Sequence, residues 1–171
     1  MKIFAFSDSH RDGSEMRLAL EKAVRHVGAV VHLGDGWPEI HELMRSYPQI
    51  PLYAVTGNCD AEPEQSVLTF HCHGRKILLT HGHTLHVKNN YERISLFAAE
   101  NEADVCLFGH THIPVIFQAG RTLMVNPGSI GIPKDKQPRT YAVIDIPEDG
   151  AIHAQIVGRQ PGGAYQPILF A

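Results

Sequence analysis

Two histidines that directly follow a short apolar run are the residues of this sequence best suited to metal chemistry. The apolar run at 105–108 ends in Gly109, and His110 and His112 follow it two positions apart. If the backbone stays extended past the glycine, both side chains project from the same side. Imidazole nitrogens are common ligands of transition metals, so the motif predicts a metal site. A pair of polar loop histidines is the alternative reading of this motif taken alone.

Ligand-type side chains also follow four other short apolar runs, at 3–6, 30–33, 52–55 and 77–80. The side chains that follow these runs are Asp8 and His10, then Asp35, then Asn58, and then His81. In open α/β sheets, ligands bind beyond the carboxyl ends of the strands, so we expect five strand ends to converge on one cleft. His83 is an alternative to His81, because Gly82 between them makes the local backbone unpredictable.

Composition predicts one globular domain over residues 1–171, with 43% hydrophobic and 19% charged residues. A net charge of -3 gives no basic field, so stable nucleic-acid binding is not expected. The sequence shows neither a signal-peptide pattern nor an apolar run near the length of a membrane span. Its 3 cysteines never stand in Cys-x-x-Cys spacing, which argues against a disulfide framework. We therefore expect a cytoplasmic protein that does not bind membranes.

The first half of the chain alternates strands with helices. Asp12 offers a helix N-cap with a glutamate three residues later, and apolar residues from 16 to 27 repeat at helical spacing. Pro38 suits the first turn of a second helix that ends before Pro48, and a third helix is expected over 91–100. The runs at 67–70 and 76–79 predict a hairpin.

The second half of the chain predicts strands only, in two hairpins built from residues 115–125 and 141–157. Two hairpins added to an α/β first half predict a two-sheet α/β sandwich with flanking helices. We expect residues 158–171 to be a flexible C-terminal tail. Its apolar end, Ile168-Leu169-Phe170, would need to dock, and docking on a partner subunit would make the protein a homo-oligomer.

Five motifs, taken in order, resemble the signature motifs of the calcineurin-like metallophosphoesterase superfamily. They are Asp8-x-His10, Gly34-Asp35, Gly57-Asn58, His81 and Gly109-His110-x-His112. The Gly-Asn-Cys-Asp form of the third motif, together with Asn126-Pro127-Gly128-Ser129, is most similar to the small prokaryotic phosphodiesterases of that superfamily. The resemblance spans most of the chain and implies the superfamily's α/β sandwich fold.

The resemblance also implies a binuclear metal site. One metal would be bound by Asp8, His10 and His112, the second by Asn58, His81 and His110, and Asp35 would bridge both. Mixed nitrogen and oxygen ligands suit two divalent transition-metal ions, with manganese favoured and nickel, cobalt, iron or zinc as alternatives.

The activity implied is that of a metal-dependent phosphodiesterase acting on a phosphodiester small molecule or nucleotide through a hydroxide that bridges the metals. Two divalent ions, two carboxylates and one hydroxide leave roughly +1 to meet a phosphodiester anion. Asp35, Asn58 and His81 are the residues assigned to catalysis. The alternatives are a phosphomonoesterase on the same site and a non-catalytic scaffold, since the superfamily includes a retromer subunit. All seven ligand positions hold ligand-competent residues, which favours the enzyme.

Two residues beside the motifs are assigned to the substrate. Arg11 follows His10, where the superfamily commonly has glycine, and its guanidinium could bind the phosphate in a bidentate manner. A solvated loop arginine is the alternative. Cys59 stands where the superfamily usually has a histidine that protonates the leaving oxygen. A thiol with an ordinary pKa near 8.5 suits that role poorly.

Five further residues near the motifs are given supporting or structural roles. Ser9 and Thr111 lie between ligands and are expected to point away from the metals. Asp60 is expected to hold a neighbouring ligand in place. We favour a structural turn for the segment that begins at Asn126, and a core or surface position for His32.

Overall fold

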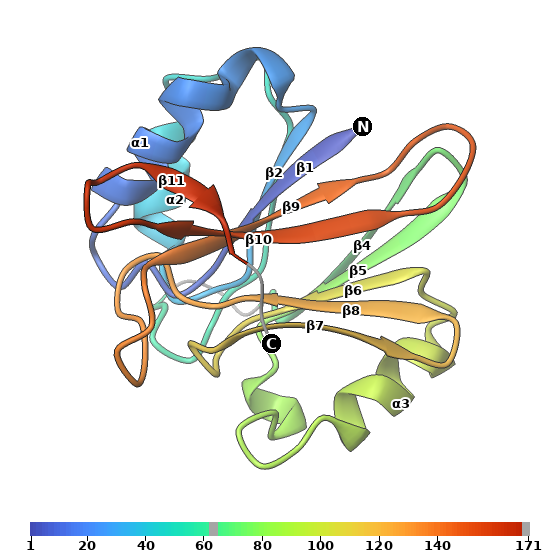
Figure 1. The fold of residues 1–171 in the computed structure, drawn as a ribbon. Coiled ribbons are helices and arrows are strands. Elements are labelled where there is room, and N and C mark those ends of the chain that lie inside the picture. Colours follow the sequence, from blue (N-terminus) through green and yellow to red (C-terminus); the bar gives the residue numbers. More distant parts are fainter. Residues whose placement is uncertain (62–64, 169–171) are drawn as a thin grey trace.

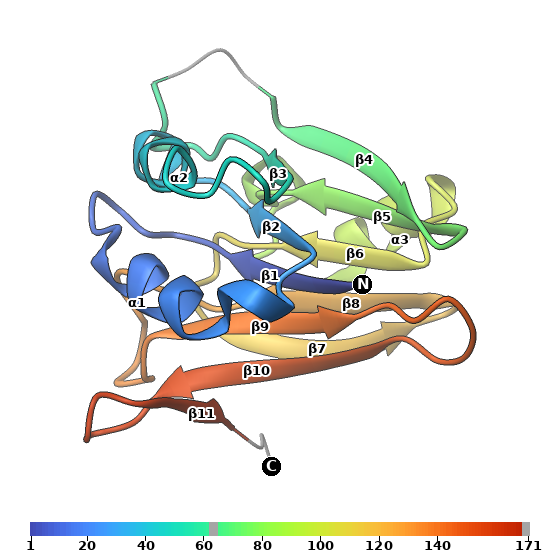
Figure 2. The same cartoon turned by 90° about the horizontal axis from the view of Figure 1, so that it is seen from above.

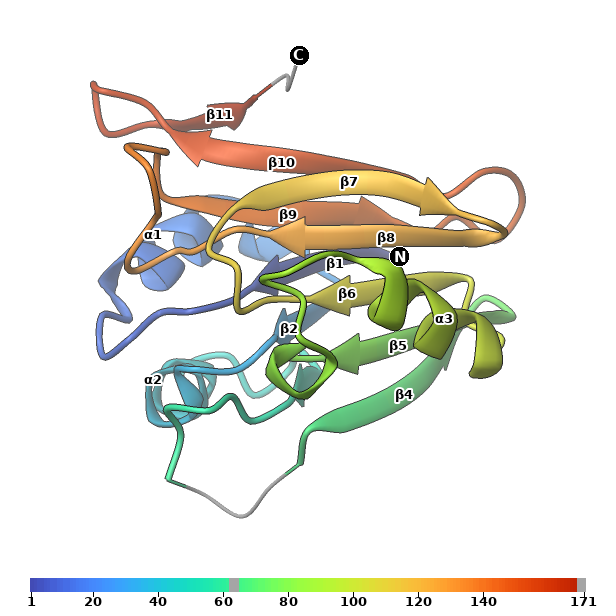
Figure 3. The same ribbon diagram turned by 90° about the horizontal axis from the view of Figure 1, so that it is seen from below.

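The computed structural model describes residues 1–61 and 65–168 and shows a sandwich of two sheets (Figure 1). The first sheet has six strands in the order β11-β10-β9-β1-β2-β3, and the second has five in the order β4-β5-β6-β8-β7. Helices α1 and α2 cover the outer face of the first sheet, and α3 covers the outer face of the second (Figures 2 and 3). The predicted α/β sandwich with flanking helices is confirmed.

The first sheet carries the parallel strands of the N-terminal half. Its strands are β1 (Lys2–Phe6), β2 (Ala29–His32), β3 (Leu52–Ala54), β9 (Thr140–Asp145), β10 (His153–Arg159) and β11 (Tyr165–Pro167). β1 pairs in parallel with β2, and β2 with β3, whereas β9 runs antiparallel to β1. The carboxyl ends of β1, β2 and β3 therefore lie at one edge of this sheet.

The second sheet places two more parallel strands at its centre. Its strands are β4 (Val67–Cys72), β5 (Arg75–Thr80), β6 (Val105–Phe108), β7 (Pro114–Ala119) and β8 (Thr122–Pro127). β5, β6 and β8 are parallel, and the antiparallel strands β4 and β7 close the two edges. The predicted β4–β5 hairpin forms, and its turn uses His73 and Gly74, both with positive φ.

The helices lie close to their predicted positions. They are α1 (Ser14–Ala23), the 3-10 turn η1 (Val24–His26), α2 (Trp37–Met44), the 3-10 turn η2 (His83–Leu85) and α3 (Glu92–Glu100). The N-cap of α1 is Gly13 and not Asp12. Asp12 still supports the first turn, because its Oδ1 accepts a hydrogen bond from the Ser14 backbone N–H at 3.1 Å. None of the helices in the described part of the chain has the length and apolar character needed to cross a bilayer.

Strand β1 shows how the layers are held together. Its Ile3 and Ala5 face the inner core between the two sheets, whereas Phe4 and Phe6 face α1 and α2. This alternation follows from the two-residue period of a strand. Phe6 is fully buried, and its replacement by alanine would destabilise the fold by about 3–5 kcal/mol. Because both of its faces are packed, β1 is held firmly in place. The loop that follows β1 carries the first residues of the candidate site.

The C-terminal segment differs from the flexible tail predicted for residues 158–171. Residues 165–167 form β11, which pairs antiparallel with the end of β10. The Tyr165 hydroxyl donates to Glu15 Oε2 at 2.8 Å, and Arg159 lies 2.8 Å from Glu15 Oε1. Gly163, with φ of 80°, turns the chain back so that this pairing forms. Ile168 packs against the inner core, and the predicted docking of Leu169 and Phe170 falls outside the described residues.

Candidate metal centre

The loops that follow β1, β2, β3, β5 and β6 meet at one end of the sandwich, as the strand-end pattern predicts. The Asp8 N–H donates to Gly34 O at 3.0 Å, which joins the loops after β1 and β2. The Gly109 N–H donates to His81 O at 3.2 Å, which joins the ends of β5 and β6. Five strand ends from two sheets therefore supply one site.

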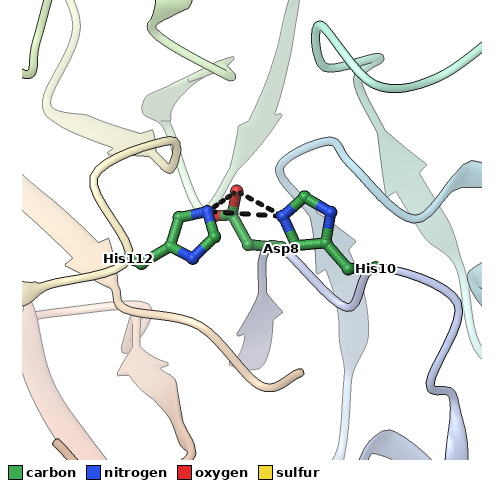
Figure 4. A group of neighbouring side chains, drawn as sticks. All are labelled: Asp8, His10 and His112. Carbon is green, nitrogen blue, oxygen red and sulfur yellow. Dashed lines mark hydrogen bonds and ion pairs between the residues drawn. The ribbon is translucent and has the colours of Figure 1, made fainter. Parts of the chain in front are cut away.

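A first cluster consists of Asp8, His10 and His112 (Figure 4). His112 Nε2 lies 3.1 Å from Asp8 Oδ1 and 3.3 Å from His10 Nε2. Figure 4 shows that the two imidazoles come from separate loops and point their ring nitrogens toward the carboxylate between them. His112 Nδ1 lies 2.6 Å from the carbonyl oxygen of Ile132. Because a carbonyl only accepts, Nδ1 carries the proton and the Nε2 lone pair faces Asp8.

A second cluster consists of Asp35, His81 and His110, with Asn58 beside it. His81 Nε2 lies 3.5 Å from Asp35 Oδ2, 3.3 Å from Asn58 Oδ1 and 3.1 Å from His110 Nδ1. His81 Nδ1 donates to the carbonyl oxygen of Leu33 at 2.6 Å. The His81 tautomer is therefore fixed in the same way as that of His112, with the Nε2 lone pair directed into the cluster.

Asp35 lies between the two clusters. Its Oδ2 is 3.5 Å from His81 Nε2 and 3.8 Å from His10 Nε2, so one oxygen faces an imidazole of each cluster. Its Oδ1 accepts a hydrogen bond from the Cys59 backbone N–H at 2.8 Å, which fixes the orientation of the carboxylate. This is the placement that a bridging ligand would need.

The contacts within these clusters fit bound cations. The Nε2 lone pairs of His81 and His112 face carboxylate oxygens, and two acceptors repel unless a proton or a metal ion lies between them. Asp8 Oδ1 is buried, and no hydrogen-bond donor reaches it among the described residues. A buried carboxylate is costly unless a positive group compensates its charge. Imidazole and carboxylate donors suit a divalent transition metal.

The pKa shifts of the two carboxylates and of His81 and His112, but not that of His110, agree with a site that attracts positive charge. Burial raises the pKa of Asp8 and Asp35, but contacts with His112 and His81 outweigh burial, so both pKa values lie below the ordinary value. Burial lowers the pKa of His81, but Asp35 and Asp8 outweigh it and raise that pKa. The neighbouring Asp8 carboxylate raises the pKa of His112. Burial and the charge of His81 lower the pKa of His110 to about 4.

The backbone at His110 and His112 is not extended, contrary to the expectation from the sequence. They have φ of 68° and 60°, and Thr111 N–H donates to Gly109 O at 2.8 Å, which closes a tight turn. The His110 N–H donates to Asp8 Oδ2 at 3.1 Å. The turn therefore sends one histidine into each cluster.

Asp60 supports the site through the backbone. Its carboxylate accepts hydrogen bonds from four N–H groups, those of Asp35 (2.8 Å), Gly36 (2.9 Å), Trp37 (3.0 Å) and Gly57 (2.7 Å). The loops after β2 and β3 are thereby tied to one another. A Cβ at Gly57 would lie 2.1 Å from Asp35 Oδ1, so this close approach requires glycine. The geometry agrees with the positioning role expected for Asp60.

Asn126 and Pro127 are the last residues of β8 and not part of a turn, Gly128 follows with φ of 78°, and the segment that begins at Asn126 contacts two of the site loops. Buried Asn126 donates from Nδ2 to Gly109 O at 2.9 Å and to Thr111 Oγ1 at 3.0 Å. Ser129 Oγ donates to the backbone oxygen of Asp8 at 2.8 Å. The structural role favoured from the sequence therefore includes support of the loops that carry His110, His112 and Asp8.

His32 is a core residue. It is fully buried, with Nε2 3.3 Å from Ser9 Oγ and Nδ1 accepting the Gly34 N–H at 3.3 Å. Burial lowers its pKa to about 4. Ser9 is likewise buried, so its hydroxyl bonds to His32.

His83 lies beside the second cluster but does not belong to it. Among the described residues, His81 and not His83 is part of a group whose ligand atoms could bind one metal. The His83 ring centroid lies 5.3 Å from that of His81 and 6.0 Å from that of His110. The backbone at Gly82 is left-handed, with φ of 94°, and η2 begins directly after it. This turn separates the directions of the two histidines.

A cavity of about 370 Å³ opens beside the centre. Residues of its wall include His10, Arg11, Asp35, Glu39 and Cys59. The two residues assigned to substrate from the sequence thus face one space. Glu39 was missed, because an acidic residue in the first turn of a helix is ordinarily explained by the helix dipole.

The fold and the site together define an α/β sandwich protein whose strand ends gather carboxylates and imidazoles into groups that could hold metal ions. Residues 1–149 match the family model of the calcineurin-like phosphoesterase superfamily domain. The chain belongs to this superfamily, whose members include metal-dependent phosphoesterases.

The curated relatives cover different shares of the chain. The probable metallophosphoesterase YsnB of Bacillus subtilis is 35% identical over 153 residues, which is 88% of each chain. Phosphodiesterase YfcE of Escherichia coli K12 is 38% identical over 101 residues, covering 54% of this chain and 51% of YfcE. The match to YsnB, which covers most of both chains, agrees with the family assignment.

Two solved structures share the whole fold. A conserved protein of Streptococcus pneumoniae TIGR4, described as a predicted phosphoesterase, has a TM-score of 0.79 at 30% identity and covers 98% of this chain and 96% of its own. Zinc-complexed Vps29 of Entamoeba histolytica has a TM-score of 0.81 at 18% identity and covers 98% of both chains. At that identity, the likeness to Vps29 shows the fold alone.

Proposed function

We propose that the protein is a metal-dependent phosphodiesterase with a binuclear centre. The observation that carries the proposal is the pair of Nε2 lone pairs, on His81 and His112, held against buried carboxylates by backbone acceptors on Nδ1. The proposed ligands are Asp8, His10 and His112 for one metal, Asn58, His81 and His110 for the other, and Asp35 as the bridge. When bound, two divalent ions would supply Lewis acidity and lower the pKa of water to near 7.

The residues of the chain would position these ions and the substrate. Asp35 is oriented by the Cys59 N–H so that Oδ2 faces both clusters. Asn58 adds a neutral oxygen 3.3 Å from His81 Nε2, which supplies a ligand without adding negative charge. Arg11 lies on the cavity wall next to His10, where its guanidinium can bind two phosphate oxygens.

A diester suits the site better than a monoester. Arg11 and Glu39 share the cavity wall, so their opposite charges offset one another there. The wall therefore adds little positive charge for a dianionic monoester, whereas a diester carries a single negative charge. The relative YfcE is named a phosphodiesterase, in agreement with this choice.

The nature of the ions and the cellular setting belong to the same proposal. Mixed imidazole, amide and carboxylate ligands suit manganese, with nickel, cobalt, iron or zinc as alternatives. The substrate would be a small phosphodiester or a nucleotide. Cys59, Cys72 and Cys106 are free thiols, which supports action in the reducing cytoplasm.

Metal reconstitution tests the proposal. Protein stripped by a chelator would be reloaded with manganese, nickel, cobalt or zinc, and the metal content and the hydrolysis of bis-p-nitrophenyl phosphate would be measured together. We expect two metals per chain and faster turnover of this diester than of p-nitrophenyl phosphate. Two bound metals without any hydrolysis would support the non-catalytic scaffold, and faster turnover of the monoester would support a phosphomonoesterase.

A further inference from the structure

The cavity beside the metal centre contains a carboxylate that the proposed reaction does not use. We infer that Glu39 is a specificity-determining residue, and that the cavity takes an ester group that carries a hydrogen-bond donor. An ammonium group would bind more tightly than a hydroxyl group, because Glu39 is an acid. This inference rests on the proposed function, since the phosphate of the same substrate would lie at the metal centre.

The position of the cavity connects it to the centre. His10 and Asp35 belong both to its wall and to the candidate metal groups. A phosphate held at the centre therefore places its ester group between the loop after β1 and the first turn of α2. Ligand sites usually have volumes of roughly 300–1,000 Å³. The volume of about 370 Å³ admits a small alcohol group.

The other carboxylates near the cavity are already occupied. Both oxygens of Asp60 accept backbone N–H groups, and Asp35 has one oxygen on the Cys59 N–H and the other directed at imidazoles. Glu39 is different. The residue lines the cavity, and its side chain takes part in no hydrogen bond or ion pair among the described residues.

A carboxylate without a partner is free to accept a hydrogen bond, so a donor group on a ligand in the cavity would bind to it. Hydrogen bonds to charged groups are worth more than those between neutral groups, on the order of tenfold or more in affinity. Arg11, on the same wall, would face the phosphate oxygens. The two side chains together would recognise a phosphate and, a few bonds away, a donor.

Three phosphate monoesters that differ only in the attached group test the inference on the metal-reconstituted protein. O-phosphoethanolamine carries an ammonium group, glycerol 3-phosphate carries hydroxyl groups, and n-propyl phosphate carries no hydrogen-bond donor on its alkyl group. Their dissociation constants would be measured by calorimetry. We expect phosphoethanolamine to bind at least about tenfold more tightly than propyl phosphate, with glycerol 3-phosphate between them.

Two variants and one control assign the preference to Glu39. Glu39→Gln should reduce the preference for ammonium to within about threefold, and Glu39→Leu should also remove the preference for hydroxyl. Binding of propyl phosphate should not weaken in either variant, because the charge of Arg11 is then no longer offset. Glu42→Gln is the control, because Glu42 is an exposed residue of the same helix and should change nothing. Thermal melts of the variants would report any loss of fold stability.

Equal affinities for the three ligands in the wild-type protein, or a preference that survives in Glu39→Leu, would overturn the inference. The proposed function fails differently. Its failure is the absence of bis-p-nitrophenyl phosphate hydrolysis by the metal-loaded protein. Calorimetry does not depend on turnover, so the role of Glu39 can be decided in either case.

Discussion

The Asp60 carboxylate accepts the backbone N–H of Asp35 at 2.8 Å, although the two residues are 25 positions apart in the sequence. The same Oδ2 accepts the Gly57 N–H at 2.7 Å. One side chain thus joins the loop that carries the proposed bridging carboxylate to the loop that carries Asn58. This cross-link makes the ligand geometry depend on a residue that contacts no proposed metal position.

Replacing Asp60 should therefore weaken metal binding. Asp60→Asn keeps one acceptor oxygen but places an amide group against backbone N–H donors. We expect metal affinity to fall about 10- to 100-fold, as for other residues that support metal ligands. Competition with a chromogenic chelator measures this change.

Asp104 gives the matched control for Asp60. Its carboxylate also accepts a hydrogen bond from a backbone N–H, that of Lys76 at 2.8 Å. Asp104 does not belong to the candidate site. Asp104→Asn should leave metal affinity unchanged. Unchanged affinity in Asp60→Asn as well would contradict the positioning role.

Asp35 should matter to both metals. Asp35→Asn or Asp35→Ala removes the oxygen that faces both clusters, so metal stoichiometry should drop below two and turnover should be abolished. Elemental analysis and the bis-p-nitrophenyl phosphate assay measure the two effects, with exposed Asp149→Asn as the control. A variant that keeps two metals and near-normal activity would show that Asp35 is not the bridge.

Cys59 should contribute little to the chemistry. Burial and the neighbouring Asp35 raise the pKa of its thiol above the ordinary value, so the thiol is a weak proton donor at neutral pH. Cys59→Ala should barely change turnover of an aryl diester, whose leaving group needs no proton. Cys59→His should raise activity on substrates with poor leaving groups, toward the 10²- to 10⁴-fold that a positioned acid typically supplies.

The aryl diester and an alkyl diester should be assayed side by side in each Cys59 variant. Cys59→Ser serves as the control, because it keeps the shape of the side chain but replaces the thiol with a hydroxyl group. A large loss in Cys59→Ala with both metals still bound would assign a chemical role to the thiol.

Buried His32 should account for part of the pH dependence of the free energy of unfolding of the metal-free protein. Its pKa is about 4 in the folded state, against an ordinary value near 6.5 in the unfolded chain. Between these pH values the unfolded chain binds the proton and the folded protein does not, so stability falls as pH drops from 6.5 to 4. At about 1.4 kcal/mol per pH unit, the loss attributable to His32 is on the order of 3 kcal/mol.

Urea unfolding at several pH values, with chelator present, measures this loss. His32→Gln should be less stable at pH 7, because it replaces a packed imidazole, but its stability should decline less between pH 6.5 and 4. His153→Gln is the control, because His153 is exposed. The stability of this variant should decline between pH 6.5 and 4 as much as that of the wild-type protein. Parallel wild-type and His32→Gln curves would contradict the assignment.

The sequence by itself determined the local elements and the candidate residues. Short apolar runs that end in Asp, Asn or His indicate strand ends with ligands, because a strand buried on both faces reads as a continuous apolar stretch. Helical spacing and turn residues located α1, α2, α3 and the hairpins within a few residues. The resemblance carried by five ordered motifs indicated the superfamily that the family model confirms.

Only the tertiary structure decided how these residues meet. The left-handed backbone that sends His110 and His112 into different clusters is unfavourable for most residues, and contacts such as the His110 N–H with Asp8 hold it in place. Strand β11 was missed, because its pairing with β10 depends on a turn and on contacts with distant Glu15. Glu39 carries no sequence signal of its own. Its position in the cavity arises from the packing of α2 beside the loop after β1, which no local pattern encodes.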